Sequence, residues 1–131
     1  MDDETEKPAR KPLKWIGSSK EDLKEFPGQV QKAMGHALHL AQINLKAPNA
    51  KPLRGLGGAS ILEVVEDHDG GTYRAVYTVK FQGMVYVLHV FQKKSKKGIE
   101  TPKHDIDLIK TRLKAATEHY ENQKQQKDKK P

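Results

Sequence analysis

The chain has 131 residues, a formal net charge of +7 and no cysteine. Its length suits a single domain with a modest core, and the lack of cysteine excludes disulfides and thiolate metal sites. The excess of lysine and arginine predicts an anionic partner; nucleic acid, an acidic protein and a membrane surface all fit the charge alone.

The N-terminal residues 1–11 are polar and charged and include a proline, which predicts a flexible leader before a domain over residues 12–120. A secretory signal would begin with basic residues and continue with apolar ones, whereas this segment starts MDDETE. No apolar run approaches the ~20 residues that cross a bilayer. We therefore expect a cytoplasmic protein without a membrane partner.

A short strand and two helices are predicted next. Leu13–Ile16 has the short alternating pattern of an edge strand. Ser19 is placed to cap a first helix, with Asp22 at the capping-box spacing, and Pro27 opens a second helix over Gln29–Leu45. The apolar residues of the second helix recur at helical spacing and predict one core-facing side, made of Val30, Ala33, Met34, Ala37, Leu38, Ala41 and Leu45.

The middle of the chain predicts a loop, a strand and a turn. Lys46–Gly58 contains several Pro and Gly residues and is expected to be a loop. Ile61–Glu66 is rich in residues that favour strands, and it runs into a turn at Asp67–Gly71.

A hairpin is predicted from Thr72–Phe81 and Met84–Phe91, joined at Gln82-Gly83 because Gly adopts positive φ without steric cost. The first strand places Tyr73, Ala75, Tyr77, Val79 and Phe81 on one face and Arg74, Val76, Thr78 and Lys80 on the other. The second strand is apolar on both faces except at His89, which is typical of a buried central strand.

The C-terminal part begins with a flexible basic segment, Lys94–Lys103, and continues as a helix over His104–Tyr120. Residues 121–131 form a polar Lys/Gln run that predicts a flexible tail. The order of elements is β-α-α-β-β-β-α. It predicts an α+β fold in which a mostly antiparallel sheet is packed by an N-terminal helical hairpin and a C-terminal helix.

Common catalytic and metal-binding patterns are missing. His36 and His39 share a helix, and Asp67 and Asp69 flank His68 in a turn, but neither set brings further ligands at a metal-site spacing. No glycine-rich loop is followed by the Lys-Ser/Thr pair of a phosphate-binding loop, and no serine lies in a nucleophile elbow. We predict no metal and no cofactor.

The remaining candidate is a group of basic residues at one end of the sheet. We predict that Arg74, His89, Lys93 and Lys94 are catalytic, and that Lys51, Arg54, Lys96 and Lys97 bind RNA. Fixed cations stabilise the charge of a pentacoordinate phosphate, and the RNA supplies its own 2′-hydroxyl as the nucleophile. Neighbouring cations also favour the neutral form of a lysine, which can then act as a general base. Lys96 and Lys97 fit a solvated charge run equally well.

Three segments resemble the HigB-like branch of the RelE/ParE toxin superfamily, including its phage-derived members: KPLRGLGG, ILEVVEDHDGGTYRAVYTV and VYVLHVFQKKSKKGIETPKHDIDLIKTRLKAA. The resemblance covers about Leu13 to Ala116. It implies a small RelE-like fold and the toxin of a type II toxin–antitoxin pair. Such toxins cleave translated mRNA in the ribosomal A site, leaving a 2′,3′-cyclic phosphate and a 5′-hydroxyl. A cognate antitoxin, often a helix-turn-helix protein, holds them inactive.

The resemblance also assigns individual residues. Arg74 matches the strand arginine that binds the scissile phosphate, and Lys93 and Lys94 match lysines that take part in acid–base work or phosphate binding. His89 matches the histidine of the family's LHxF motif, with a catalytic and a structural role both open. One departure is Val65, because many relatives carry an arginine two residues after the glutamate of this strand.

Two other functions fit parts of the pattern. A relative of the gyrase-poisoning branch would inhibit a protein target without nuclease chemistry, although that branch tends to lose the basic residues retained here at Arg74, His89 and Lys93. A non-catalytic RNA-binding module agrees with the charge and with Val65. The endoribonuclease is the function that the whole set of basic residues favours.

Overall fold

The computed structural model describes residues 10–56, 58, 60–93 and 101–129. Its elements in chain order are β1 (Leu13–Trp15), α1 (Ser19–Lys24), α2 (Gly28–Gln42), β2 (Ala50–Pro52), β3 (Ile61–His68), β4 (Gly71–Thr78), β5 (Val85–Lys93) and α3 (Lys103–Lys129). The predicted α+β class and the predicted order are confirmed, with one additional short strand, β2. None of the helices within the described ranges is both long and apolar enough to cross a membrane.

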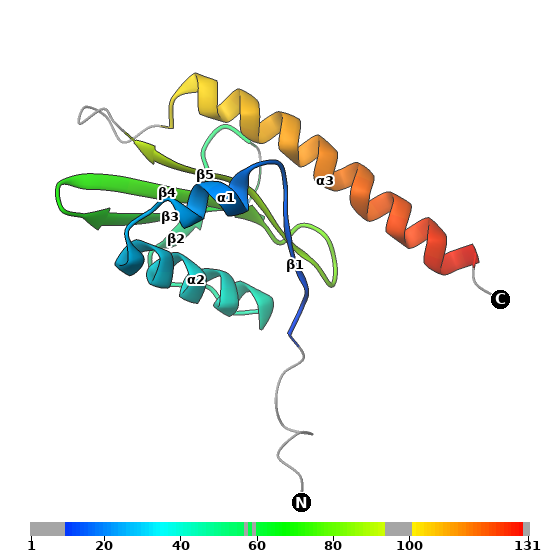
Figure 1. Cartoon of the computed structure of the whole chain (residues 1–131). Coiled ribbons are helices and arrows are strands. Elements are labelled where there is room, and N and C mark those ends of the chain that lie inside the picture. Colours follow the sequence, from blue (N-terminus) through cyan, green and yellow to red (C-terminus); the bar gives the residue numbers. More distant parts are fainter. Residues whose placement is uncertain (1–9, 57, 59, 94–100, 130–131) are drawn as a thin grey trace, which may run out of the picture.

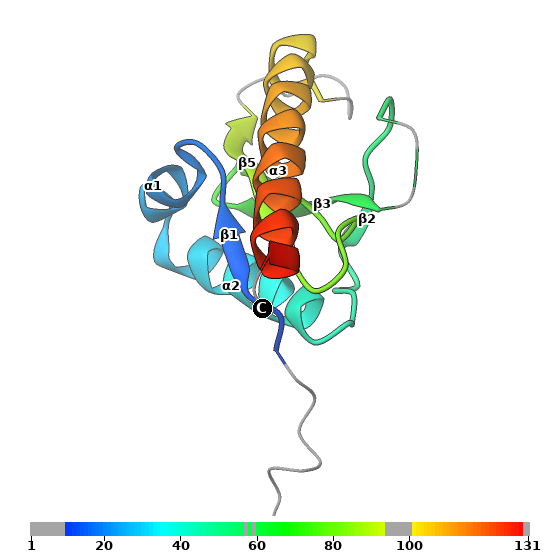
Figure 2. The same cartoon turned by 90° about the vertical axis from the view of Figure 1, so that its right-hand side faces the viewer.

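The five strands form one sheet in the order β1-β5-β4-β3-β2. Only β1 and β5 run parallel, and the other neighbours are antiparallel. β5 lies between β1 and β4, so the strand predicted to be central does have a partner on each side. Helices α2 and α3 cover opposite faces of the sheet, and α1 lies beside β5 (Figures 1 and 2).

Each face of the sheet has its own apolar core. On the α2 face, the side chains of Val30, Met34, Ala37, Leu38 and Ala41 pack against Val64, Ala75, Tyr77 and Val87. On the α3 face, Ile109 and Ala116 pack against Val76, Tyr86 and Leu88. The predicted apolar side of α2 is therefore confirmed over most of its length. Two predicted residues are exceptions: Ala33 is only partly buried, and Leu45 is 57% exposed because α2 already ends at Gln42.

A β-bulge in β5 decides where the histidine of that strand points. Val76 pairs with His89, whereas the next residue of β4, Tyr77, pairs with Val87, so Leu88 is an extra residue in β5. The bulge breaks the strict alternation of faces. His89 consequently lies opposite Val76 on the α3 face of the sheet.

The start of α1 differs from the prediction. Ser18 occupies the N-cap position rather than Ser19, and its Oγ donates a hydrogen bond to Asp22 Oδ2 at 2.8 Å. Ser19 is buried instead, and its Oγ donates to the backbone oxygen of Val87 at 3.3 Å. Ser19 is thus used to attach α1 to β5.

The β4–β5 connection is longer than the predicted two-residue turn. β4 already ends at Thr78, whose Oγ1 donates to Ser60 O and accepts from the backbone N–H of Lys80, both at 3.0 Å. Because strand alternation stops there, Phe81 does not share a face with Tyr73 as predicted. It packs on the α3 side, with ring centroids 5.4 Å from Tyr86 and 5.0 Å from Tyr120.

Two segments are more regular than predicted. The expected loop Lys46–Gly58 contains β2, an edge strand in which Pro52 is tolerated because it lies at the sheet border. Helix α3 continues to Lys129 through the residues expected to form a flexible tail, and it projects past the sheet (Figure 1). Gln, Lys and Glu are good helix formers, so a polar composition does not by itself end a helix.

Candidate functional site

The sheet register brings several predicted site residues onto the α3 face. Directly paired residues of neighbouring strands share a face, and three successive rows cross the sheet here: Lys51, Glu63, Val76 and His89; Val65, Arg74 and Phe91; Asp67, Thr72 and Lys93. The structure therefore gathers Lys51, Arg74, His89 and Lys93 on one face of the sheet, although they come from three different strands, β2, β4 and β5. The side chain of Lys93 is buried there.

Arg74 is held by a carboxylate, Glu63, that was not among the site residues predicted from the sequence. Its Nη1 donates to Glu63 Oε2 at 2.7 Å and to Thr101 Oγ1 at 3.3 Å. Thr101 Oγ1 in turn donates to the same Glu63 oxygen at 2.9 Å. Arg74 and Glu63 are only 5% and 3% exposed, so this ion pair compensates both charges away from solvent.

A sequence signal for Glu63 did exist. The residue interrupts the apolar run of β3, where a side chain on a buried strand has little access to water. A carboxylate in such a position needs a charged or hydrogen-bonding partner. Arg74 on the neighbouring strand is the residue that could supply it.

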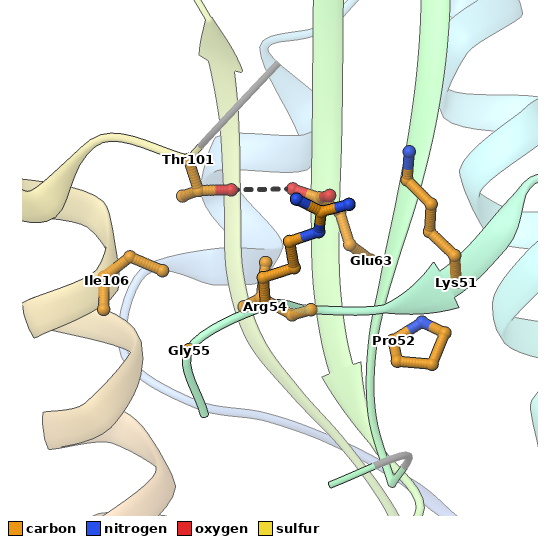
Figure 3. A pocket seen from close by; sticks show the side chains of 8 residues that line it. Lys51, Pro52, Arg54, Gly55, Glu63, Thr101 and Ile106 are labelled. Atoms are coloured by element: carbon orange, nitrogen blue, oxygen red, sulfur yellow. Dashed lines mark hydrogen bonds between the residues drawn. The ribbon is translucent and has the colours of Figure 1, made fainter. Parts of the chain in front are cut away.

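An open pocket lies beside this ion pair. Its volume is about 340 Å³, and its lining consists of Lys51, Pro52, Leu53, Arg54, Gly55, Glu63, Thr101 and Ile106. Figure 3 shows Lys51 and Arg54 extending from β2 and the following segment, with Glu63 and Thr101 joined by a hydrogen bond. Lys51 and Arg54 are exposed, so the pocket has cations at its rim and a carboxylate in its wall.

His89 is enclosed between the sheet and α3. Its Nε2 lies 2.8 Å from Asp105 Oδ1, its Nδ1 lies 3.4 Å from Arg112 Nη1, and its ring stacks on Phe91 with centroids 4.5 Å apart. Burial lowers the pKa of His89 below its ordinary 6.5, although Asp105 acts in the opposite direction. These contacts fit a neutral ring that donates from Nε2 to Asp105 and accepts from Arg112 at Nδ1.

Arg112 connects this histidine to the beginning of α1. Its Nη1 also donates to the backbone oxygen of Leu88, the bulge residue, at 3.0 Å, and its Nη2 donates to Ser18 Oγ at 3.1 Å. The guanidinium lies against Gly17, where an added Cβ would come within 2.7 Å of Arg112 Nε. Arg112 was not among the residues predicted from the sequence, although Asp105 and Arg112 are two turns apart and so share a helix face.

The other predicted residues are distributed as follows. Arg54 lines the pocket together with Lys51, which lies in β2 rather than in a loop. Lys94, Lys96 and Lys97 lie outside the residues that the structure describes. Over the described ranges, no three His, Asp or Glu side chains come together as metal ligands would.

Fold and site together define an α+β domain with a basic, partly charge-compensated face on one side of its sheet. A family model, phage-derived protein Gp49-like (DUF891), matches residues 21–114, and the chain belongs to this family. No curated protein matches the sequence significantly. The crystal structure of the toxin–antitoxin complex RelBE2 from Mycobacterium tuberculosis contains a similar chain, with 21% identity and a TM-score of 0.44. That match covers 68% of this chain and 98% of the other.

Proposed function

We propose that the chain is the toxin of a type II toxin–antitoxin pair and a metal-independent endoribonuclease that cleaves mRNA in the ribosomal A site. The observation that carries the proposal is the register that places Lys51, Arg74 and Lys93 on one face of the sheet. Membership of a phage-derived family and the HigB-like motifs support it. The proposed partners are mRNA, the ribosome and a cognate antitoxin with a helix-turn-helix fold.

The proposed reaction uses the RNA as its own nucleophile. The 2′-oxygen loses its proton to a base and forms a bond to phosphorus, while the bond from phosphorus to the 5′-oxygen breaks and that oxygen takes up a proton. The products are a 2′,3′-cyclic phosphate and a 5′-hydroxyl. Lys93 and Lys94 are the proposed proton carriers, and the positive charges of Arg74 and Lys51 stabilise the pentacoordinate phosphate.

The Glu63–Arg74 pair sets a condition on this mechanism. A phosphate can use Arg74 only if it shares the guanidinium with Glu63 or displaces the carboxylate. Cations at the pocket rim, Lys51 and Arg54, would favour a phosphate at this place by attraction. Substrate binding and opening of the ion pair are therefore expected to be coupled.

For His89 we propose a positioning role rather than acid–base catalysis. Both of its ring nitrogens already lie beside side chains of α3, and its ring is stacked on Phe91. A proton transfer through either nitrogen would disturb the contact that holds α3 on the sheet. The residue is better placed to fix the helix than to reach RNA.

A second function, a non-catalytic RNA-binding module, is favoured by one specific observation. Val65 lies directly across the sheet from Arg74, at the position where the resemblance predicts a second arginine. With one arginine and one glutamate in place of two arginines and a glutamate, this part of the site is close to neutral. Such a site can bind RNA through Lys51 and Arg54 without cleaving it.

The test is controlled expression of the wild type, Arg74→Lys and Lys93→Ala, followed by mapping of the 5′ ends of cellular mRNA. Arg74→Lys keeps a positive charge beside Glu63 but loses the planar fork that binds phosphate. Lys110→Ala, which removes an exposed lysine from α3, is the matched control. The expected result for the wild type and Lys110→Ala is growth arrest with new 5′-hydroxyl ends in phase with codons. Arg74→Lys and Lys93→Ala should lose both the arrest and the new ends.

Two other outcomes would contradict the proposal. Growth arrest with intact mRNA would indicate another target, as in the gyrase-poisoning branch. Salt-dependent RNA binding by the purified chain, without arrest or new RNA ends, would favour the non-catalytic module.

A further inference from the structure

The carboxylate of Glu63 uses its two oxygens differently. Both hydrogen bonds that it accepts, from Arg74 Nη1 at 2.7 Å and from Thr101 Oγ1 at 2.9 Å, end on Oε2. The other oxygen, Oε1, accepts none from the side chains and backbone within the described residues. An ionised carboxylate oxygen is an acceptor only. Glu63 therefore presents an acceptor to whatever occupies the adjoining pocket.

The pocket itself combines three kinds of surface. Pro52, Leu53 and Ile106 provide apolar walls, Glu63 provides the acceptor, and Lys51 and Arg54 provide exposed positive charge (Figure 3). Its volume of about 340 Å³ falls within the range of roughly 300–1,000 Å³ that holds small organic ligands. An occupant that fits all three surfaces has a flat apolar body, an N–H donor and a nearby negative charge.

Simpler occupants satisfy only part of this pattern. A free phosphate is attracted by Lys51 and Arg54 but offers no donor to Glu63. A basic side chain offers a donor, but the two rim cations repel it. An acidic side chain is attracted by the rim and repelled by Glu63. A nucleotide has all three features, because its base is flat and carries N–H groups and its phosphate is negative.

We infer that this pocket is a recognition subsite for one unstacked RNA base with an exocyclic amino group: cytosine, adenine or guanine. The amino group donates to Glu63 Oε1, the base lies against Leu53 and Ile106, and the flanking phosphates contact Lys51 and Arg54. Carboxylates commonly read such amino groups, and single-stranded RNA is commonly read by its splayed-out bases. Uracil is disfavoured because its only ring N–H is flanked by two carbonyl oxygens, which the carboxylate repels.

This inference deepens the proposed function, since base selection at the pocket would set the sequence preference of cleavage. It can nevertheless be measured without any cleavage. The probe is a short oligouridylate with 2′-O-methyl groups, which block the nucleophile, and with one central base varied. Affinities of the whole chain for the four probes are compared at one salt concentration.

The wild type is expected to bind the probes with central C, A or G about tenfold more tightly than the all-uracil probe. Methyl signals of Leu53 and Ile106 are expected to shift in NMR spectra with the preferred probes only. Equal affinity for all four probes would overturn the inference. This comparison needs no variant, so it stands even where a substitution disturbs folding.

Glu63→Gln provides the sharper test. The glutamine oxygen can still accept from Arg74 and Thr101, while its NH₂ group faces the pocket as a donor. The preference should then move toward uracil, whose carbonyl accepts from that group. An unchanged preference in a folded Glu63→Gln variant would also overturn the inference.

Lys51→Ala is the matched control for charge. It should weaken binding of all four probes to the same extent and lower the salt dependence by about one phosphate contact. The two proposals fail in different ways. Codon-phased cleavage in cells, together with equal affinity for all four probes, would contradict the proposed base subsite but not the proposed endoribonuclease. Different affinities for the four probes, without mRNA cleavage in cells, would contradict the proposed endoribonuclease and still support the base subsite.

Discussion

Arg74 of β4 and Val65 of β3 lie directly opposite each other on the α3 face of the sheet. Val65 is half-buried, and Arg74 is turned into an ion pair with Glu63, two residues before Val65 on the same strand. The charge available to a substrate at this place therefore depends on one arginine that already has a carboxylate partner.

We expect Val65→Arg to raise RNA affinity and, under the proposed function, the rate of cleavage, each by about tenfold. The added guanidinium would lie next to Arg74 and compete for Glu63, which releases positive charge toward the pocket. A long arginine side chain at a half-buried position can still reach solvent. Binding of a short RNA and the yield of 5′-hydroxyl ends measure the two effects. Val65→Leu is the size control, and an equal gain in that variant would contradict the electrostatic explanation.

Arg74→Ala should destabilise the fold by about 3–5 kcal/mol, because it leaves the Glu63 carboxylate buried without its main partner. Replacing both residues, as Arg74→Met with Glu63→Leu, should recover much of this loss. Urea unfolding of the two single variants and the double variant gives the coupling free energy. Additive effects would show that the pair does not act as a unit. Because Arg74→Ala is expected to destabilise the fold, a loss of toxicity in this variant alone would not distinguish unfolding from a loss of catalysis.

The elements of this fold were largely predictable because each has a clear periodic signal. The apolar side of α2 and the alternating residues of β4 are local patterns, and the structure confirms both. Predictions from local patterns were wrong where a tertiary contact sets the position of a side chain or the end of a strand. Ser19 is drawn away from capping by Val87 O, and Phe81 leaves the strand pattern because Thr78 closes β4 early.

The candidate site was predictable only in part. The basic residues stood out in the sequence, whereas Glu63 and Arg112 were not predicted to belong to the site, because their roles depend on partners in other strands or helices. Glu63 meets Arg74 across a strand pair, and Arg112 meets His89 only because the bulge at Leu88 turns that histidine toward α3. A single extra residue in a strand changes which face carries a side chain, and local sequence patterns do not show it.

Gly17→Ala should lower the free energy of unfolding by roughly 1–3 kcal/mol. Gly17 has φ +61°, where an L side chain is strained, and the new Cβ would lie 2.7 Å from Arg112 Nε. Arg112 cannot move aside without weakening its bonds to Leu88 O and Ser18 Oγ. The effect should therefore be smaller in an Arg112→Ala background, which a double-mutant cycle of urea unfolding would measure. If Gly17→Ala lowers the free energy of unfolding equally in the wild type and in Arg112→Ala, the whole loss comes from backbone strain at residue 17.

His89 should make the stability of the protein depend on pH. Burial lowers its pKa in the folded chain, whereas in the unfolded chain it stays near the ordinary 6.5. Below about pH 6.5 the unfolded state therefore binds more protons than the folded state, and stability falls as the pH falls toward the lowered folded value. The slope from this one group is at most about 1.4 kcal/mol per pH unit. Asp105 opposes the shift and Arg112 adds to it, so Asp105→Asn should lower the folded pKa further and move the loss over a wider pH range.

His89→Gln is the reference for this measurement, because glutamine can still donate to Asp105 but does not titrate. Urea unfolding at a series of pH values should show the wild type losing stability relative to His89→Gln below pH 6.5, with parallel curves above it. A wild type that instead gains relative stability on acidification would show that the ion pair with Asp105 outweighs burial. His89 would then be protonated in the folded protein, and its place between Asp105 and Arg112 would stabilise a cation.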